Sequence, residues 1–311
     1  MSAAMQAPPL SPPRQPGGRS YREALAASTA RTLRRRRITN YVMLGLTSAA
    51  ALVATLPLLF ILAHLVAKGG SSLTWGFFTR MPKPPGEAGG GMANAIVGTG
   101  MLILIASALG LPIGIGAGLF LAERRDSKLA TTVRFLSDVL NGLPSIVLGI
   151  FAWQLLVRPF RHFSALAGGI ALAAMMIPLV TRATEEMIRL VPVSLREAAL
   201  ALGYPRWRTS LGVVLRTALP GIMTGALVAV ARIAGETAPL IFTAFGNQFW
   251  SLSPLQPIAA LPMQIYNYAS TPYDDWRAQA WAGALVLLVL VLIISLAARF
   301  ATRSRFGLGG D

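Results

Sequence analysis

Apolar stretches long enough to cross a membrane recur along this chain, and they constrain its fold more than any other feature. A helix needs about 20 predominantly apolar residues to cross a hydrocarbon core of about 30 Å. Hydrophobic residues make up 54% of the 311 residues and charged residues only 13%, whereas soluble domains contain about 25% charged residues. The pattern predicts an all-α membrane protein with six transmembrane helices, at residues 40–67, 94–121, 135–157, 164–181, 218–245 and 280–298.

Basic residues are concentrated in the segments that face the cytoplasm if the N-terminus lies inside. The N-terminal segment, residues 122–134, residues 182–208 and the C-terminal segment contain eight, four, five and three Lys or Arg residues, and the outward segments contain six. By the positive-inside rule, this bias predicts that both termini are cytoplasmic.

The same pattern divides the chain into three parts. Residues 1–37 are expected to be a basic, Pro-rich, disordered tail, residues 38–300 the six-helix domain, and residues 301–311 a second cytoplasmic tail. For the basic N-terminal tail, contact with anionic membrane lipids is favoured over nucleic-acid binding.

Several kinds of chemistry lack their sequence signatures. The chain has no cysteine, which excludes disulfides and thiolate catalysis. None of its three lysines completes a G-x-x-x-x-G-K phosphate loop, so the chain is not expected to hydrolyse ATP by that route. His64 and His162 lie far apart without a carboxylate cluster, and we predict no metal site. A membrane protein that is not an enzyme is therefore expected.

Glycines in the second stretch favour tight helix packing. Gly110, Gly114 and Gly118 recur every four residues and share one helix face. Small residues at this spacing let two helix backbones approach closely.

The third stretch contains a break, "SDVLNGLPSIVLG". Pro144 should kink the helix and free a backbone carbonyl, which is tolerated at membrane depth only where protein or water satisfies it. Two interpretations remain open: a kinked packing helix, or a water-filled pathway beside Ser145.

Two charges lie inside the fifth stretch, at Arg232 and Glu236. Residues four apart on a helix can pair across one turn, and Pro239 should kink the helix beside them. A charge at the centre of a bilayer costs about 2.5–3.5 kcal/mol on insertion scales, and such residues usually face a bundle interior or a cavity. An ion pair that only supports packing is possible, but a role in a substrate pathway is favoured.

The segment at 182–208 predicts a short docking helix between two membrane spans. Pro192 ends one helix, and Ser194 with Glu197 three residues later forms a capping-box pattern. A helix is expected over 195–202, with Gly203 as the residue that terminates it. The small side chains of Ala198 and Ala199 would allow close docking into a groove of another protein.

Glu197-Ala198-Ala199 followed by Gly203 resembles the "EAA" motif of ABC-importer permeases, whose loop docks on a cytoplasmic ATPase. The motif usually continues to a Leu-Pro pair, and this chain has Leu215-Arg216 at that point, with Leu219-Pro220 shortly after. The resemblance implies the six-helix bundle of type I importers.

Several further segments resemble the PstA family, the permease subunits of high-affinity phosphate importers. These segments cover most of residues 89–246, and the run "RIAGETAPL" is the most specific of them. The resemblance implies a bacterial inner-membrane subunit that translocates phosphate together with a homologous PstC-like permease. It also implies two copies of a PstB-like ATPase holding ATP and magnesium, a periplasmic PstS-like phosphate-binding protein and a PhoU-like regulator.

Within this resemblance, Arg232 is expected to contact phosphate, with Glu236 as the counter-charge that weakens its hold. Arg182 is a second candidate for the pathway, although a solvated helix face is an equally open interpretation. Three alternatives remain: a permease for sulfate or phosphonate, a standalone channel or exchanger, and a membrane-anchored nucleic-acid binder. The docking loop argues against the channel, which has no use for an ATPase.

Overall fold

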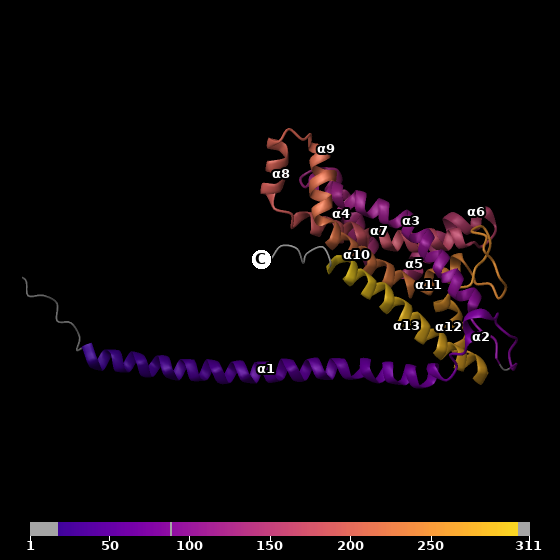
Figure 1. Ribbon diagram of the computed structural model, residues 1–311, viewed down its shortest axis with the longest axis horizontal. Helices are drawn as coiled ribbons and strands as arrows, with labels where there is room; N and C mark the ends of the chain where they lie inside the picture. Colours follow the sequence, from indigo (N-terminus) through magenta and orange to yellow (C-terminus); the bar gives the residue numbers. More distant parts are fainter. Residues whose placement is uncertain (1–17, 88, 304–311) are drawn as a thin grey trace, which may run out of the picture. The chain divides into compact units, whose positions relative to one another are not determined.

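The computed structural model describes residues 18–87 and 89–303, and within them the regular elements are helices (Figure 1). Five helices of the described part are long and apolar enough to cross a membrane, or six if one bent pair counts as a single span. The chain divides into two compact units, residues 1–63 and 64–311, which are described separately. The helices are α1 (Gly18–Gly70), α2 (Trp75–Thr79), α3 (Ala93–Glu123), α4 (Lys128–Gly142), α5 (Ser145–Ala152), η1 (Trp153–Val157), α6 (Arg158–Phe160), α7 (Ala165–Arg189), α8 (Val193–Ala201), α9 (Arg206–Arg208), η2 (Thr209–Val214), α10 (Leu215–Ala234), α11 (Ala238–Thr243), α12 (Leu261–Ala269) and α13 (Asp274–Arg303), of which η1 and η2 are π-helical.

The first helix begins well before the predicted membrane stretch. α1 is helical from Gly18, so the predicted disordered tail is wrong for residues 18–37. This segment is rich in Ala, Arg and Leu, which are strong helix formers, and the membrane stretch that follows lets the helix propagate backwards. Residues 1–17 lie outside the described part. At the other end of the chain, α13 extends the predicted last span at both ends and includes residues 301–303 of the predicted tail.

The glycine pattern of the second stretch produces close packing between α3 and α7. A Cβ added at Gly114 would lie 2.7 Å from the Val180 Cβ, and one at Gly118 would lie 2.5 Å from the Thr184 Cβ. Contact therefore advances in the same direction along both helices, which makes α3 and α7 parallel neighbours (Figure 1). The predicted role of these glycines is confirmed.

We expect Gly118→Ala to destabilise the protein and Gly116→Ala to leave it almost unchanged. The new methyl at 118 would overpack the α3–α7 contact, which costs about 1–3 kcal/mol, whereas a Cβ at Gly116 meets nothing within 4 Å. Thermal unfolding of the two variants in the same detergent checks this. Equal midpoints for the two variants would contradict the packing described here.

The third predicted span is two helices rather than one. α4 and the helical segment that begins at Ser145 are bent by 106° at a short break that contains Pro144. Pro144 precedes α5 as its N-cap residue, and a proline disfavours helical conformation in the residue before it. The chain therefore changes direction sharply where the sequence predicts a kink.

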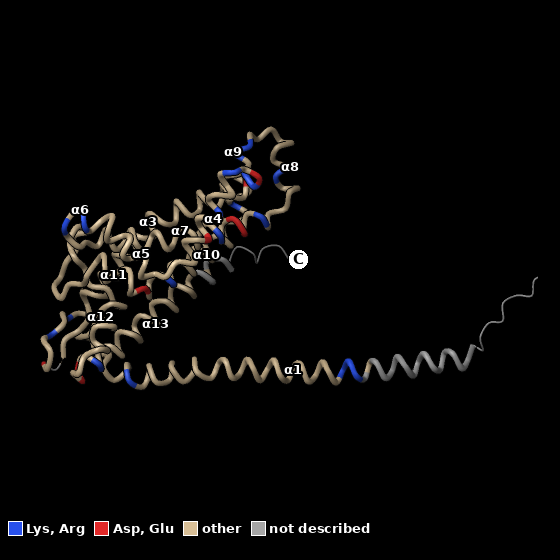
Figure 2. Tube along the Cα trace, turned by 180° about the vertical axis from the view of Figure 1, so that it is seen from behind, with Lys and Arg blue, Asp and Glu red and all other residues tan. Residues whose placement is uncertain are grey.

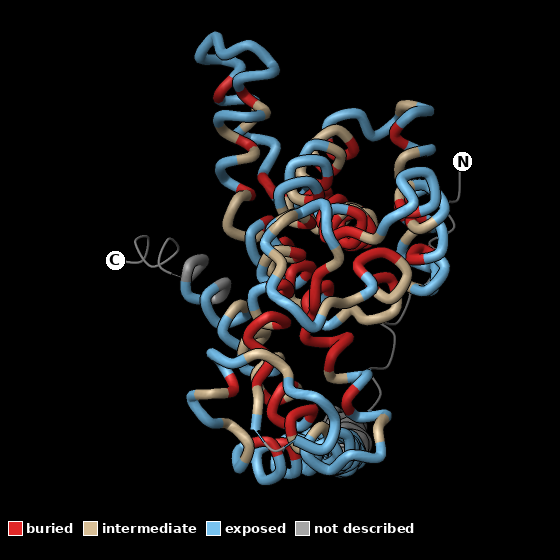
Figure 3. The backbone as a smooth tube through the Cα atoms, turned by 90° about the vertical axis from the view of Figure 1, so that its right-hand side faces the viewer, coloured by how far each residue is buried: buried red, intermediate tan, exposed pale blue. Residues whose placement is uncertain are grey.

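The two ends of the second unit differ in charge and burial. α8 and α9 lie at one end, and α2 and α12 at the other (Figure 1). Basic residues gather towards the α8 end (Figure 2), and the backbone there is mostly exposed while the centre of the bundle is buried (Figure 3). The positive-inside rule predicts that the α8 end faces the cytoplasm.

Candidate functional site

Arg232 and Glu236 lie at a break in the chain rather than inside one helix. α10 ends at Ala234 with Arg232 in its last turn, Glu236 and Thr237 are not helical, and α11 begins at Ala238. The predicted continuous helix over 218–245 is wrong. Pro239 cannot donate to a carbonyl one turn back, but a proline suits the first turn of a new helix, so the chain restarts a helix there instead of kinking one.

The break also changes the expected pairing of the two charges. Arg232 and Glu236 do not share a helix face, and within the described residues no ion pair joins them. Arg232 is exposed and Glu236 is partly exposed. The backbone amides of Gly235 and Glu236 still bond to the carbonyls of Arg232 and Ile233, at 3.3 and 3.2 Å. The predicted ion pair is therefore absent from the structure, and the two side chains are free to meet other groups.

A second break lies close to the first. α11 packs on α5, and a Cβ at Gly149 would come within 2.7 Å of the Pro239 Cα. Ser145 is four residues before Gly149, and Glu236 is three residues before Pro239. The two breaks therefore flank the same helix contact.

The two short helices also lead towards the same end of the unit. α5 continues through η1 and α6 to Phe160. The Ser164 amide donates to the Thr243 carbonyl at 3.0 Å, which places the end of α11 beside the start of α7. The N-terminal ends of both helices, where the chain is broken, thus lie away from that end of the unit.

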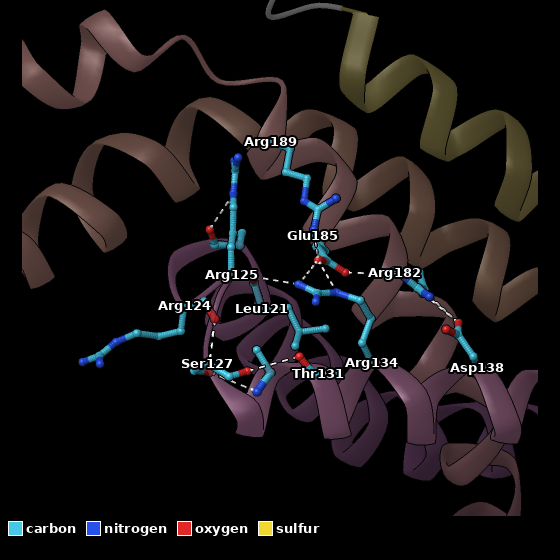
Figure 4. Close-up of polar contacts among 12 residues, drawn as sticks. Leu121, Arg124, Arg125, Ser127, Thr131, Arg134, Asp138, Arg182, Glu185 and Arg189 are labelled. Atoms are coloured by element: carbon cyan, nitrogen blue, oxygen red, sulfur yellow. Dashed lines mark hydrogen bonds and ion pairs between the residues drawn. The ribbon is translucent and has the colours of Figure 1, made fainter.

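A buried carboxylate lies at the centre of a cluster of charged side chains between α4 and α7 (Figure 4). Glu185 is 1% exposed, and its Oε1 accepts from Arg134 Nε and Nη2 at 3.0 and 2.8 Å and from Arg189 Nη2 at 2.5 Å. Arg182 Nη1 lies 3.5 Å from the other oxygen, and Arg182 also pairs with Asp138. Three arginines therefore share two carboxylates at this site.

Burial separates these contacts into two kinds. Glu185 is enclosed, and Arg134 is 22% exposed, so their interaction is little screened by solvent. The Arg182–Asp138 pair is more open, with side chains 32% and 54% exposed. Both contacts join α4 to α7, and the second leaves Arg182 partly exposed.

Sequence spacing identified only part of this cluster. Glu185 and Arg189, four residues apart on α7, do pair, but Arg182 pairs with Asp138 and Glu185 and not with Glu186, which stands at the same spacing. The Arg134–Glu185 contact joins residues 51 positions apart, and no local pattern reveals such a contact.

The two candidate arginines lie at different levels of the bundle. Gly225 lies against Ala183 and Gly221 against Met187, so α10 runs antiparallel to α7. In that register, Arg182 is level with the residue that follows Gly225 on α10. Arg232 lies six residues further along α10, which corresponds to about 9 Å along the helix axis at a rise of about 1.5 Å per residue. The structure does not bring the two arginines together.

The short helix predicted at 195–202 is present, with a different start. α8 runs from Val193 to Ala201 with Pro192 as its N-cap residue and no side-chain capping bond, so the capping box predicted at Ser194 is wrong. Proline sets a backbone angle that suits the start of a helix, and the helix begins directly after it. Ser194 lies within the first turn. Glu197 and Ala198 are exposed, whereas Ala199 is buried.

Gly203 ends this helix as the sequence predicts. Its φ is +81°, its amide donates to the Leu200 carbonyl at 3.0 Å, and the Tyr204 amide donates to the Ala199 carbonyl at 3.2 Å. These two bonds form a Schellman motif, in which glycine is favoured because it lacks a Cβ. After it, helix continues through Arg216 and Pro220, so Arg216 in place of the motif proline leaves the helical start of the fifth span intact.

Comparison with known proteins agrees with this architecture. Residues 114–306 match the family model described as binding-protein-dependent transport system inner membrane component. The phosphate transport system permease protein PstA of Yersinia pestis is 48% identical over 265 residues, covering 85% of this chain and 90% of the relative. The protein of the same name from Xylella fastidiosa strain Temecula1 is 46% identical over 277 residues, covering 88% and 96%.

Solved structures share the fold at lower identity. An inward-facing form of the MetNI methionine ABC transporter has a TM-score of 0.54 and 19% identity, covering 68% of this chain and 96% of that chain. An amino acid ABC transporter crystallised with histidines has a TM-score of 0.52 and 18% identity, covering 68% and 92%. These likenesses show an ABC-transporter permease fold.

Proposed function

Because this chain belongs to the family of binding-protein-dependent transport system inner membrane components, and within it to the PstA phosphate permeases, we propose that it forms one half of an ATP-driven pathway for phosphate. The chain itself is a multi-pass, non-enzymatic membrane component. Its proposed partners are a homologous PstC-like permease, two copies of a PstB-like ATPase that binds ATP and magnesium, and a PstS-like phosphate-binding protein. A PhoU-like regulator and a bacterial inner-membrane location belong to the same proposal.

The observation that carries this proposal is the pair of adjacent breaks with an exposed arginine. Broken helices and ionisable side chains are costly against lipid. The face that carries the two breaks and Arg232 therefore requires water or another protein over it. A homologous permease packed on the same face would enclose a polar route between the two chains. Half of such a route, on one chain, accounts for an exposed Arg232 beside a break between two apolar helices.

In this pathway Arg232 would hold phosphate, because the planar guanidinium offers paired donors that match phosphate oxygens. Glu236, four residues on and outside the helix, would oppose the bound anion and favour its release. Ser145, at the start of α5, supplies a hydroxyl at the neighbouring break. Arg182 would meet phosphate about two turns further towards the α8 end, where it pairs with the partly exposed Asp138 and lies 3.5 Å from Glu185.

The α8 end suits the docking of an ATPase. Large apolar side chains are exposed there, including Leu190 (73%), Val193 (66%) and Leu202 (79%). If this end projects into the cytoplasm, water would leave those side chains unpaired, and exposed apolar patches of this kind mark protein interaction sites. Glu197, Ala198 and Ala199, followed by Gly203, would place the helix in a groove of the ATPase.

We expect Gly203→Val to weaken ATPase docking, because a β-branched residue is strained at a positive φ. The strain costs about 1–2 kcal/mol, which corresponds to an affinity for the ATPase that is about 5- to 30-fold lower. Titration of the ATPase onto the purified permease pair measures this. Gly212→Val is the control, since Gly212 has open space around it and an ordinary φ. Equal affinity in both variants would argue against α8 as the docking element.

Proteoliposomes test the proposed mechanism against a standalone channel. The permease pair is reconstituted with the binding protein, with and without the ATPase, and phosphate accumulation is followed after ATP is supplied. The proposal expects accumulation only when both the ATPase and ATP are present. Phosphate passage without the ATPase would favour a channel or exchanger instead.

A further inference from the structure

Among the residues that the structure describes, one ion pair connects the docking helix to a part of the bundle that is distant in sequence. Arg196 of α8 donates from Nη1 to Glu123 Oε1 at 2.6 Å, and the side chains are 23% and 29% exposed. Glu123 is the last residue of α3, 73 positions before Arg196. Elsewhere α8 packs mainly on η2, which follows it in the chain.

The position of each charge is unfavourable to its own helix. Glu123 is a negative charge at the C-terminal end of α3, where the helix dipole is already negative. Arg196 lies in the first turns of α8, near the positive end of that dipole. The helix dipole therefore does not account for either charge. The ion pair between the two side chains does.

The helix that receives this contact is tightly joined to the rest of the bundle. The three glycines of α3 bring its backbone against α7, with a Cβ at Gly110 lying 2.9 Å from Met176 Sδ. α7 in turn holds α4 through Glu185 and Arg134. A displacement of Glu123 would therefore be passed to α7 and α4, whose far end is the break at Pro144.

We propose that the Arg196–Glu123 ion pair is the link that makes α3 and α7 move with the docking helix during the ATP cycle. Without it, α8 is still connected to α7 and α9 and packs on η2, but no ion pair among the described residues holds it to α3. ATP hydrolysis would then continue with less movement at the pathway. Both residues act through the helices they join and touch no substrate, so they are positioning residues. This inference rests on the proposed function of an ATP-driven permease.

The test is the amount of phosphate imported per ATP hydrolysed by the complete reconstituted complex. We expect Arg196→Gln and Glu123→Gln each to lower this ratio about five-fold or more, a typical size for coupling between two sites. The charge swap, Arg196→Glu with Glu123→Arg, should restore most of the ratio, and its charges also suit both helix dipoles. Arg124→Gln is the control, because Arg124 neighbours Glu123 and its side chain makes no hydrogen bond or ion pair within the described residues.

The outcomes separate this inference from the proposed function. Wild-type ratios in both single variants, or a swap that fails to restore them, would overturn the inference while leaving phosphate transport intact. If the wild-type complex hydrolyses ATP in response to another oxyanion and not to phosphate, the proposed substrate is wrong. The amount of that oxyanion imported per ATP hydrolysed, compared between the wild type and the Arg196 and Glu123 variants, then tests the inference.

Discussion

Replacing Arg232 by Gln is expected to reduce phosphate uptake about 10- to 100-fold. Charge-assisted hydrogen bonds of the kind an arginine forms with phosphate contribute about 1.5–3 kcal/mol, and each 1.4 kcal/mol corresponds to about a factor of ten. Glutamine retains a donor and most of the side-chain length but loses the charge and the paired geometry. Initial rates of radiolabelled phosphate uptake measure the effect.

Arg216→Gln is the matched control for this experiment. Arg216 is also an exposed arginine of α10, but it lies at the opposite end of that helix from the break. The account expects near wild-type uptake from this variant at equal expression. Equal uptake by the Arg232 and Arg216 variants would remove Arg232 from the pathway and leave it a role in contact with the partner permease.

Glu185→Gln is expected to produce the largest loss of stability. The substitution leaves Arg134 and Arg189 beside a buried amide, without the carboxylate that they share. Removal of one partner from a fully buried ion pair costs about 3–5 kcal/mol, and because Arg134 and Arg189 are partly exposed, we expect a loss near the lower end of this range. The midpoint of thermal unfolding in detergent should therefore fall well below that of the wild type.

Glu186→Gln controls for the loss of one negative charge on the same helix. Glu186 is exposed and forms no ion pair within the described residues, so its replacement should change stability little. If the two glutamate variants unfold at the same temperature, the buried cluster does not hold α4 on α7.

Local patterns predicted the features that depend on neighbouring residues. The spacing of Gly110, Gly114 and Gly118 predicted a close helix contact, because the requirement for a small side chain is visible at each position. Gly203 was predictable for the same reason, since a positive φ after a helix favours glycine. The membrane character of the chain followed from composition and stretch length alone.

The breaks show where local patterns were insufficient. Pro144 and Pro239 predicted that the helices would be distorted. A proline can produce either a kink or a complete break, and the local sequence does not distinguish the two. At Pro239 the outcome depended on the packing of α11 against α5. The predicted pair of Arg232 and Glu236 was wrong because it assumed one continuous helix. Residues four apart lie on the same face only where the helix is unbroken.

The charge clusters depended on tertiary structure. Asp138 and Arg134 are four residues apart on α4, yet each pairs with α7 rather than with the other. Glu123 and Arg196 are likewise joined by the fold and not by spacing. Contacts of this kind require the relative placement of helices, which the sequence of one chain does not contain.

The most direct test of the account is phosphate uptake at micromolar concentration in a host that lacks its own high-affinity system. The host expresses the other importer subunits with or without this chain, and excess sulfate is added as a competitor. The account predicts uptake that requires this chain and is unaffected by sulfate. Uptake that is absent although the complex assembles, or that sulfate abolishes, would contradict the assignment of phosphate and favour another oxyanion.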